Sequence, residues 1–165
     1  MRLLAAGTIL SFMAIVASAQ DPGTPAAAPV PVQILSGKRV FVSNATGESM
    51  VPAGSGELTY NQFYVSMKHW GRYELAAVPA DADLIFEIHY EAGSGWVSVY
   101  NGEGGSVQIP QIRLIIRDPT TRAVLWAFTE AVQAVGKKST GMQNFQHSMA
   151  ALMGDLKTLT ANPKT

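Results

Sequence analysis

The sequence predicts an α+β fold, an antiparallel or mixed sheet of about five to six strands with two helices packed on one face. Short segments in which apolar and polar residues alternate are typical of half-buried strands. Two longer segments, residues 57–70 and 139–160, instead repeat apolar residues at three- and four-residue steps, as amphipathic helices do. Because helices and strands do not alternate regularly along the chain, we expect the helices to be segregated on one side of the sheet.

The N-terminal segment has the three-part pattern of a secretory signal peptide. Arg2 is followed by an uncharged apolar run from Leu3 to Val16 and then by the small residues Ala17-Ser18-Ala19. We therefore expect residues 1–19 to be removed by cleavage between Ala19 and Gln20. The run is shorter than the roughly 20 residues that cross a bilayer, so we expect no stable membrane span after cleavage. The mature protein is expected to be periplasmic or secreted.

The composition limits what the mature chain can be. Residues 20–37 are rich in Pro and Ala and are interpreted as a linker, and residues 38–161 are long enough for a single α+β domain with its own core. Cysteine is absent, which excludes a thiol nucleophile, a thiolate metal site and an acylated cysteine. The full chain has twelve basic and twelve acidic residues, and loss of Arg2 leaves the mature chain with a formal net charge of −1, so we expect no nucleic-acid partner.

The first half of the domain is expected to be a strand, a loop and a helix. Val40 and Val42 alternate in the strand, and a Gly- and Pro-rich loop follows. The segment 57–70 has an aromatic helical face, interpreted as core packing, and Gly71 stands where a helix C-cap glycine is expected. This face consists of Tyr60, Phe63, Tyr64, Met67 and Trp70.

The second half is expected to contain most of the sheet. A short strand at residues 72–78, a polar turn and a strand at residues 84–91 come first, followed by a glycine-flanked strand at residues 96–100. Pro110 indicates a sheet edge or a bulge in the next strand, because proline cannot donate to a strand ladder.

The last strand and the final helix follow a strong turn signal. The sequence Asp118-Pro119-Thr120-Thr121 predicts a type I turn that joins two antiparallel strands, the second at residues 122–134. Ser139 and Thr140 are expected to cap the last helix.

Glu87, His89 and Glu91 share one face of the strand at residues 84–91. Same-face neighbours lie about 6.7 Å apart on a strand, whereas metal bonds are about 2 Å long, so one ion cannot take all three. Arg113 and Arg117 alternate on the polar face of a strand expected nearby, and we interpret the five residues as a ladder of ion pairs. A metal or acid/base site that uses Glu87 and His89 is the alternative.

No recognised catalytic signature is present. The chain has neither a Gly-x-Ser-x-Gly elbow nor a complete phosphate-binding loop, so we assign no catalytic residue and expect no cofactor. The most promising surface is the glycine-rich segment 93–106, which contains Trp96 and Tyr100. It is either a loop that binds a partner through these two aromatic residues or a plain β-hairpin that extends the sheet.

Residues 71–90, GRYELAAVPADADLIFEIHY, and residues 112–132, IRLIIRDPTTRAVLWAFTEAV, followed by an amphipathic helix, resemble uncharacterised bacterial exported proteins and lipoprotein domains of unknown function. More distantly, the order of elements is similar to the N-terminal α+β domain of the periplasmic translocation protein TolB. Together with the missing chemical signature, this favours a non-enzymatic exported module that binds a protein or an envelope component. The alternatives are a small-ligand binder or a metal-dependent hydrolase that uses Glu87 and His89.

Overall fold

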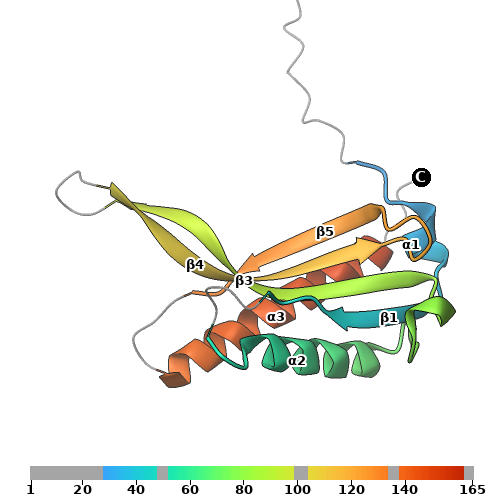
Figure 1. Cartoon of the computed structure of the whole chain (residues 1–165), viewed down its shortest axis with the longest axis horizontal. Coiled ribbons are helices and arrows are strands. Elements are labelled where there is room, and N and C mark those ends of the chain that lie inside the picture. Colours follow the sequence, from blue (N-terminus) through green and yellow to red (C-terminus); the bar gives the residue numbers. More distant parts are fainter. Residues whose placement is uncertain (1–27, 48–51, 99–103, 134–137, 162–165) are drawn as a thin grey trace, which may run out of the picture.

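A mixed five-stranded sheet in the order β2-β1-β3-β4-β5 forms the centre of the domain in a computed structural model of the chain. The structure describes residues 28–47, 52–98, 104–133 and 138–161. The predicted α+β class is confirmed (Figure 1). The strands are β1 (Arg39–Asn44), β2 (Glu74–Leu75), β3 (Leu84–Ser98), β4 (Gly104–Arg117) and β5 (Val124–Ala131). The helices are α1 (Val32–Ser36), α2 (Ser55–Trp70) and α3 (Lys138–Ala161), with a 3₁₀ turn, η1, at Pro79–Asp81.

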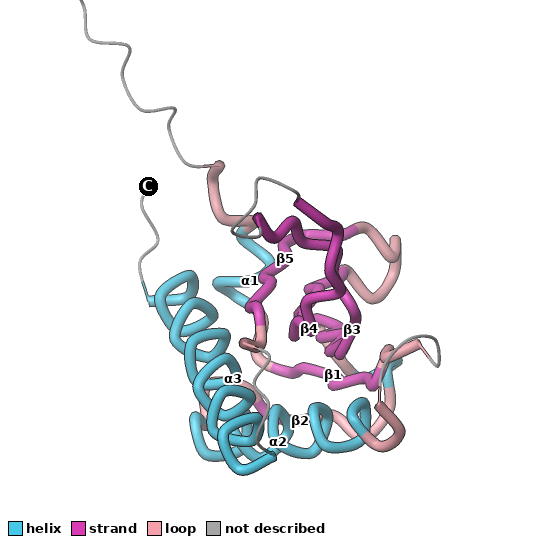
Figure 2. Tube along the Cα trace, turned by 90° about the vertical axis from the view of Figure 1, so that its left-hand side faces the viewer, coloured by secondary structure: helices cyan, strands magenta, loops and turns pink. Residues whose placement is uncertain are grey.

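Strand pairing in the sheet changes from parallel to antiparallel at the central strand, β3. Strand β1 pairs in parallel with β2 and β3, whereas β3, β4 and β5 form an antiparallel meander. Helices α2 and α3 lie on the same side of the sheet (Figure 2). They cover the apolar face of the strands, so the core is a single layer between sheet and helices.

The core follows the predicted alternation. Every second side chain in the core-facing parts of β1, β3 and β4 points into the core. Each of these residues is at most 4% exposed. Burying one such side chain contributes roughly 1.5–3 kcal/mol. These strand residues are Val40, Val42, Leu84, Phe86, Ile88, Ile112, Leu114 and Ile116. Helix α3 supplies Phe145, Met149, Leu152, Met153 and Leu156 from the other side.

Helix α2 was predicted well because its signals are local. Phe63 and Met67 are fully buried, and the other aromatic residues of the predicted face pack against the same core, which confirms the packing interpretation. Gly71 adopts a φ of 67°, and its N–H donates to the Met67 carbonyl at 3.1 Å. Glycine is the residue that adopts this left-handed conformation without steric cost, so the helix ends where the sequence indicates.

The ordered structure begins before residue 38, within the segment that was interpreted as linker. Helix α1 is a single turn whose Ile34 is fully buried in the core. The Tyr73 hydroxyl donates to the Ile34 carbonyl at 2.9 Å, and Arg72 donates to the Leu35 carbonyl at 2.6 Å. Contacts with residues far along the chain hold this turn, and the proline-rich composition of the surrounding segment 20–37 gave no sign of them.

Two other expectations were wrong. No break separates residues 84–91 from residues 96–98: β3 runs continuously through Gly93 and Gly95, because the ladder to β4 depends on the backbone and tolerates glycine. Helix α3 begins at Lys138, so Ser139 and Thr140 lie inside its first turn instead of capping it. The predicted turn after β4 is confirmed, with Asp118 accepting hydrogen bonds from the N–H groups of Thr120 and Thr121 at 2.9 and 2.6 Å.

Candidate functional site: the arm and the pocket at its base

The β3–β4 hairpin extends past the rest of the sheet (Figure 1). Strand β1 pairs with β3 only as far as Ile88, and β5 pairs with β4 only from Gln111 onward. Seven further residue pairs, from Ala92 opposite Pro110 to Ser98 opposite Gly104, have no third strand within the described residues. We call residues 92–98 and 104–110 the arm.

The arm contains one of the two predicted binding residues. Trp96 lies in β3, directly opposite Ser106 of β4. Tyr100 lies outside the described residues. The structure therefore favours the hairpin description of residues 93–98 and 104–106, and a binding role for Trp96 and Tyr100 stays a prediction.

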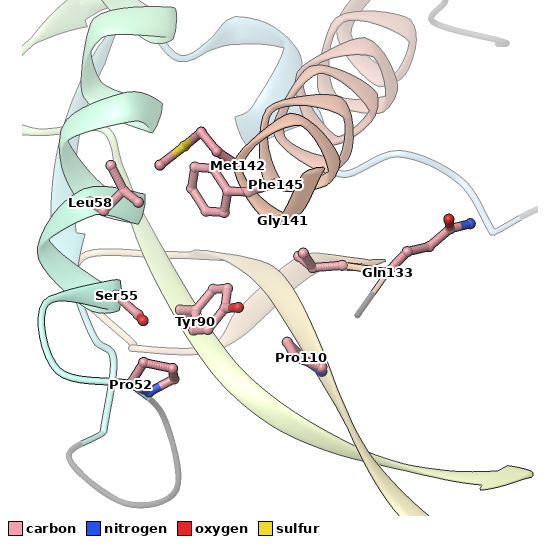
Figure 3. A pocket seen from close by; sticks show the side chains of 10 residues that line it. Pro52, Ser55, Leu58, Tyr90, Pro110, Gln133, Gly141, Met142 and Phe145 are labelled. Carbon is pink, nitrogen blue, oxygen red and sulfur yellow. The ribbon is translucent and has the colours of Figure 1, made fainter. Parts of the chain in front are cut away.

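An apolar pocket of about 370 Å³ opens at the base of the arm (Figure 3). It lies between the N-terminal ends of α2 and α3, and the two central strands contribute residues where the arm begins. Its lining residues are Pro52, Ser55, Leu58, Tyr90, Pro110, Val132, Gln133, Gly141, Met142 and Phe145. Sequence reasoning missed this pocket because these residues come from five separate segments. Met142 of α3 is 43% exposed in the structure, but its residue type alone does not distinguish a pocket residue from a core residue.

Tyr90 is the central residue of the pocket. Its ring lies 6.2 Å from that of Phe145, measured between centroids, and its backbone N–H donates to Thr46 Oγ1 at 3.0 Å. Its hydroxyl points into the space between the helices and Pro110 (Figure 3). Burial raises the pKa of this hydroxyl above its ordinary value, so it stays neutral and can donate a hydrogen bond.

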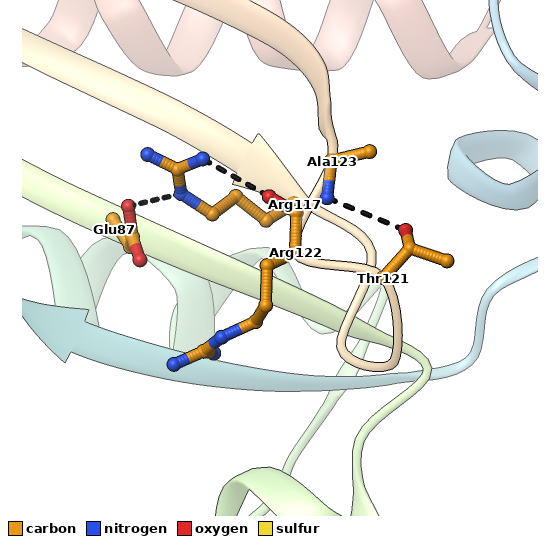
Figure 4. A network of polar contacts seen from close by, with 5 residues as sticks. All are labelled: Glu87, Arg117, Thr121, Arg122 and Ala123. Carbon is orange, nitrogen blue, oxygen red and sulfur yellow. Dashed lines mark hydrogen bonds and ion pairs between the residues drawn. The ribbon is translucent and has the colours of Figure 1, made fainter.

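The polar face of β3 lies on the opposite side of the sheet and carries the predicted ion pairs. Arg117 Nε lies 2.6 Å from Glu87 Oε2 (Figure 4), and Arg113 Nη1 lies 3.6 Å from Glu91 Oε1. His89 stands directly opposite Arg113 in the ladder. The two Glu–Arg ion pairs of the predicted ladder are confirmed, whereas His89 forms no ion pair with the residues that the structure describes.

The alternative metal site gains no geometric support. The Glu87 carboxylate is already held by the Arg117 guanidinium. In the part of the chain that the structure describes, no three His, Asp or Glu side chains lie close enough together to hold a metal ion. None of the described helices is long and apolar enough to cross a membrane.

Comparison with known proteins identifies the fold. No protein-family model matches the chain, and no curated protein matches its sequence. Among solved structures, the PelC dodecamer from Paraburkholderia phytofirmans is similar with a TM-score of 0.50 and 15% identity, over 78% of this chain and 93% of that one. A DUF330 protein from Xanthomonas campestris follows with a TM-score of 0.48 and 12% identity, over 79% of this chain and 89% of that one.

A lipoprotein from Neisseria meningitidis has a TM-score of 0.41 and 12% identity, over 71% of this chain and 99% of that one. These three structures are of bacterial proteins, one of them a lipoprotein. The resemblance to TolB stays a prediction.

Proposed function

We propose that the protein is an exported, non-enzymatic bacterial envelope or secreted module that binds another protein through the arm. The observation that supports this most directly is the run of seven β3–β4 residue pairs beyond the rest of the sheet. The signal-peptide pattern of residues 1–19 supports export.

The physical argument concerns the open backbone edges of the arm. A two-stranded hairpin is at best marginally stable in water, because it lacks a third strand or a packed face. Its unpaired N–H and C=O groups are a template for an additional strand from another chain. Trp96 and Tyr100 would add large aromatic side chains, the kind that contribute most to binding energy at protein interfaces.

Two kinds of protein partner fit this proposal. PelC, which is similar to the chain in fold, forms a dodecamer, and this makes a second copy of the chain one candidate. A different envelope protein is the other. In both cases the arm, and not the ion ladder of Glu87 and Arg117, would be the contact surface.

Site-specific photo-crosslinking in a bacterium that exports the protein tests the proposal. A photoreactive phenylalanine analogue would replace Ser94 or Gln108, which are exposed on the arm, or Lys157, which is exposed on α3 and serves as the control. We expect adducts from the two arm positions and not from Lys157, and we expect Trp96→Ala and Tyr100→Ala to reduce them. The adduct mass distinguishes a second copy from another protein. Absence of adducts from both arm positions, or equal adducts from Lys157, would overturn the proposal.

A further inference from the structure

The pocket at the base of the arm has the properties of a small-molecule site. Its volume of about 370 Å³ lies within the range of about 300–1,000 Å³ that ligand pockets occupy. Its walls come from both long helices and from the sheet, so a ligand there would contact three parts of the fold at once (Figure 3). Leu58, Met142 and Phe145 supply apolar surface from the helices, and Tyr90 and Pro110 supply it from the strands.

The polar groups of the lining define the chemistry of the ligand. None of the ten lining residues carries a charged side chain at neutral pH. A charged ligand would lose hydration there without a charged side chain among these described lining residues as a partner, which is costly. The Tyr90 hydroxyl, the Ser55 hydroxyl and the Gln133 amide are the side chains that could form hydrogen bonds with a ligand.

Gly141 contributes to the pocket lining from α3. A Cβ atom placed on Gly141 would have no heavy atom within 4 Å, so a side chain at this position would enter empty space beside the pocket. Gly141 lies in the helix, where glycine is less favourable than alanine by roughly 0.5–1 kcal/mol, and no positive φ requires it. The position thus accepts larger residues without a clash of the Cβ atom.

We propose that this pocket binds a neutral, mainly apolar small molecule that carries one hydrogen-bonding group, with that group on the Tyr90 hydroxyl and the apolar part against Leu58, Met142 and Phe145. This site is separate from the protein contact proposed for the arm. The ligand could be a single hydrocarbon chain of a membrane lipid or a free apolar compound, since both present the same chemistry to the pocket.

Two fluorescent dyes with the same aromatic frame test the charge requirement. N-phenyl-1-naphthylamine is neutral and carries one N–H group, whereas 8-anilino-1-naphthalenesulfonate adds a negative charge. We expect the neutral dye to bind the purified mature protein with one site per chain and the sulfonate to bind at least roughly tenfold more weakly, because none of the described lining side chains is charged. Equal affinity for the two dyes would overturn the proposal.

A matched pair of glycine substitutions tests the location. Gly141 and Gly154 are both in α3 and both have open space around a built Cβ atom, but Gly154 does not line the pocket. We expect Gly141→Phe to fill the pocket and abolish binding of the neutral dye, while Gly154→Phe leaves it unchanged. If the two variants bind the dye equally, the dye occupies another site and the proposal fails.

A third variant tests the hydrogen bond without changing the shape of the pocket. Tyr90→Phe keeps the ring and removes the hydroxyl, so we expect neutral-dye affinity to fall by roughly three- to tenfold. An unchanged affinity would remove Tyr90 from the proposal and contradict it as stated. Trp96→Ala should bind the dye normally, which separates failure at the pocket from failure of the proposed arm contact.

Displacement of the dye distinguishes the two sources of ligand. Decanol displaces it if the pocket takes any neutral apolar chain that ends in a hydroxyl. Phosphatidylethanolamine vesicles also take up free dye by partition, so they count as displacing it only if native mass spectrometry of the protein separated from them shows a bound lipid. Displacement by decanol alone indicates a free compound, and displacement by both indicates a lipid. Displacement by neither contradicts the proposal.

Discussion

The Arg117 guanidinium donates from Nε to Glu87 Oε2 at 2.6 Å, across the two central strands, and its Nη1 donates to the Arg122 carbonyl at 3.1 Å (Figure 4). Arg117 therefore joins the middle of the sheet to the turn that follows β4. The Glu87 and Arg117 side chains are only 19% and 27% exposed, so water screens this pair less than it screens a pair on an open surface.

Loss of Arg117 is expected to destabilise the protein. Arg117→Ala leaves the half-buried Glu87 carboxylate without its partner, and we expect the free energy of unfolding to fall by about 1.5–3 kcal/mol. Arg113→Ala is the matched control, because its pair with Glu91 is longer, at 3.6 Å, and more exposed. Its loss should cost less than about 1 kcal/mol. Urea unfolding measures both values, and equal losses would contradict this account of the ladder.

Backbone strain at Arg122 is expected to respond to branching at the Cβ atom of its side chain. Arg122 is the one non-glycine residue with a positive φ, 61°, among those the structure describes, and β-branched residues rarely adopt this conformation. Arg122→Gly keeps the carbonyl that Arg117 contacts and should leave the stability unchanged or slightly higher. Arg122→Val should lower it by about 1–3 kcal/mol. Thermal melts measure the difference, and a valine variant as stable as the glycine variant would refute the assignment of strain.

The Glu130 carboxyl is expected to make the stability depend on pH. Burial raises the pKa of Glu130 above its ordinary value, and a hydrogen bond with Asp155 and the charge of Asp155 raise it further, whereas His147 opposes this. Because the folded state prefers the protonated form, the ionised form lowers the stability above the folded pKa. This cost disappears as the pH falls through that pKa toward the ordinary value of about 4.3.

Glu130→Gln should therefore raise the stability at pH 8 by less than about 1 kcal/mol, because the group is partly solvated. The advantage should shrink as the pH is lowered to about 4. Melting temperatures of wild type and variant over this range measure it. Asp155→Asn removes the same repulsion from the other side and should show the same trend. A pH-independent difference would be inconsistent with titration of Glu130.

The signal-peptide prediction can be checked directly. Export of the full chain in a bacterium should give a mature protein that begins at Gln20, because Ala17 and Ala19 occupy the small-residue positions of the cleavage site. Intact-mass measurement and N-terminal sequencing identify the first residue. Ala19→Leu should leave the precursor uncleaved. An unprocessed wild-type chain in the exported fraction would rule out cleavage at this position.

Features that depend on neighbouring residues were predictable from the sequence. The C-terminal end of α2 at Gly71 and the turn at Asp118 are each determined by a few consecutive residues with definite backbone preferences. The ion ladder was also predictable, because alternation fixes which side chains share a face and the turn at Asp118 fixes which strand lies beside β3.

Features that depend on distant contacts were not predictable in this way. The single turn of α1 is held by Tyr73 and by burial of Ile34, and neither contact has a periodic signature in the sequence. The pocket combines Tyr90 with Phe145, residues that lie 55 positions apart and come together only after α3 packs on the sheet. The alternation of apolar and polar residues therefore predicted the strand that carries Tyr90. It did not predict the pocket between that strand and the helices.

The continuity of β3 and β4 has a mechanical consequence. No hinge separates the arm from the sheet: Tyr90 lies two residues before the arm in β3, and Pro110 is the last arm residue in β4. A partner that twists the arm would apply torque to the same backbone that forms the floor of the pocket. If such a twist couples the two sites, each ligand changes the affinity for the other by the same factor, so occupancy of the pocket would alter binding of a partner to the arm.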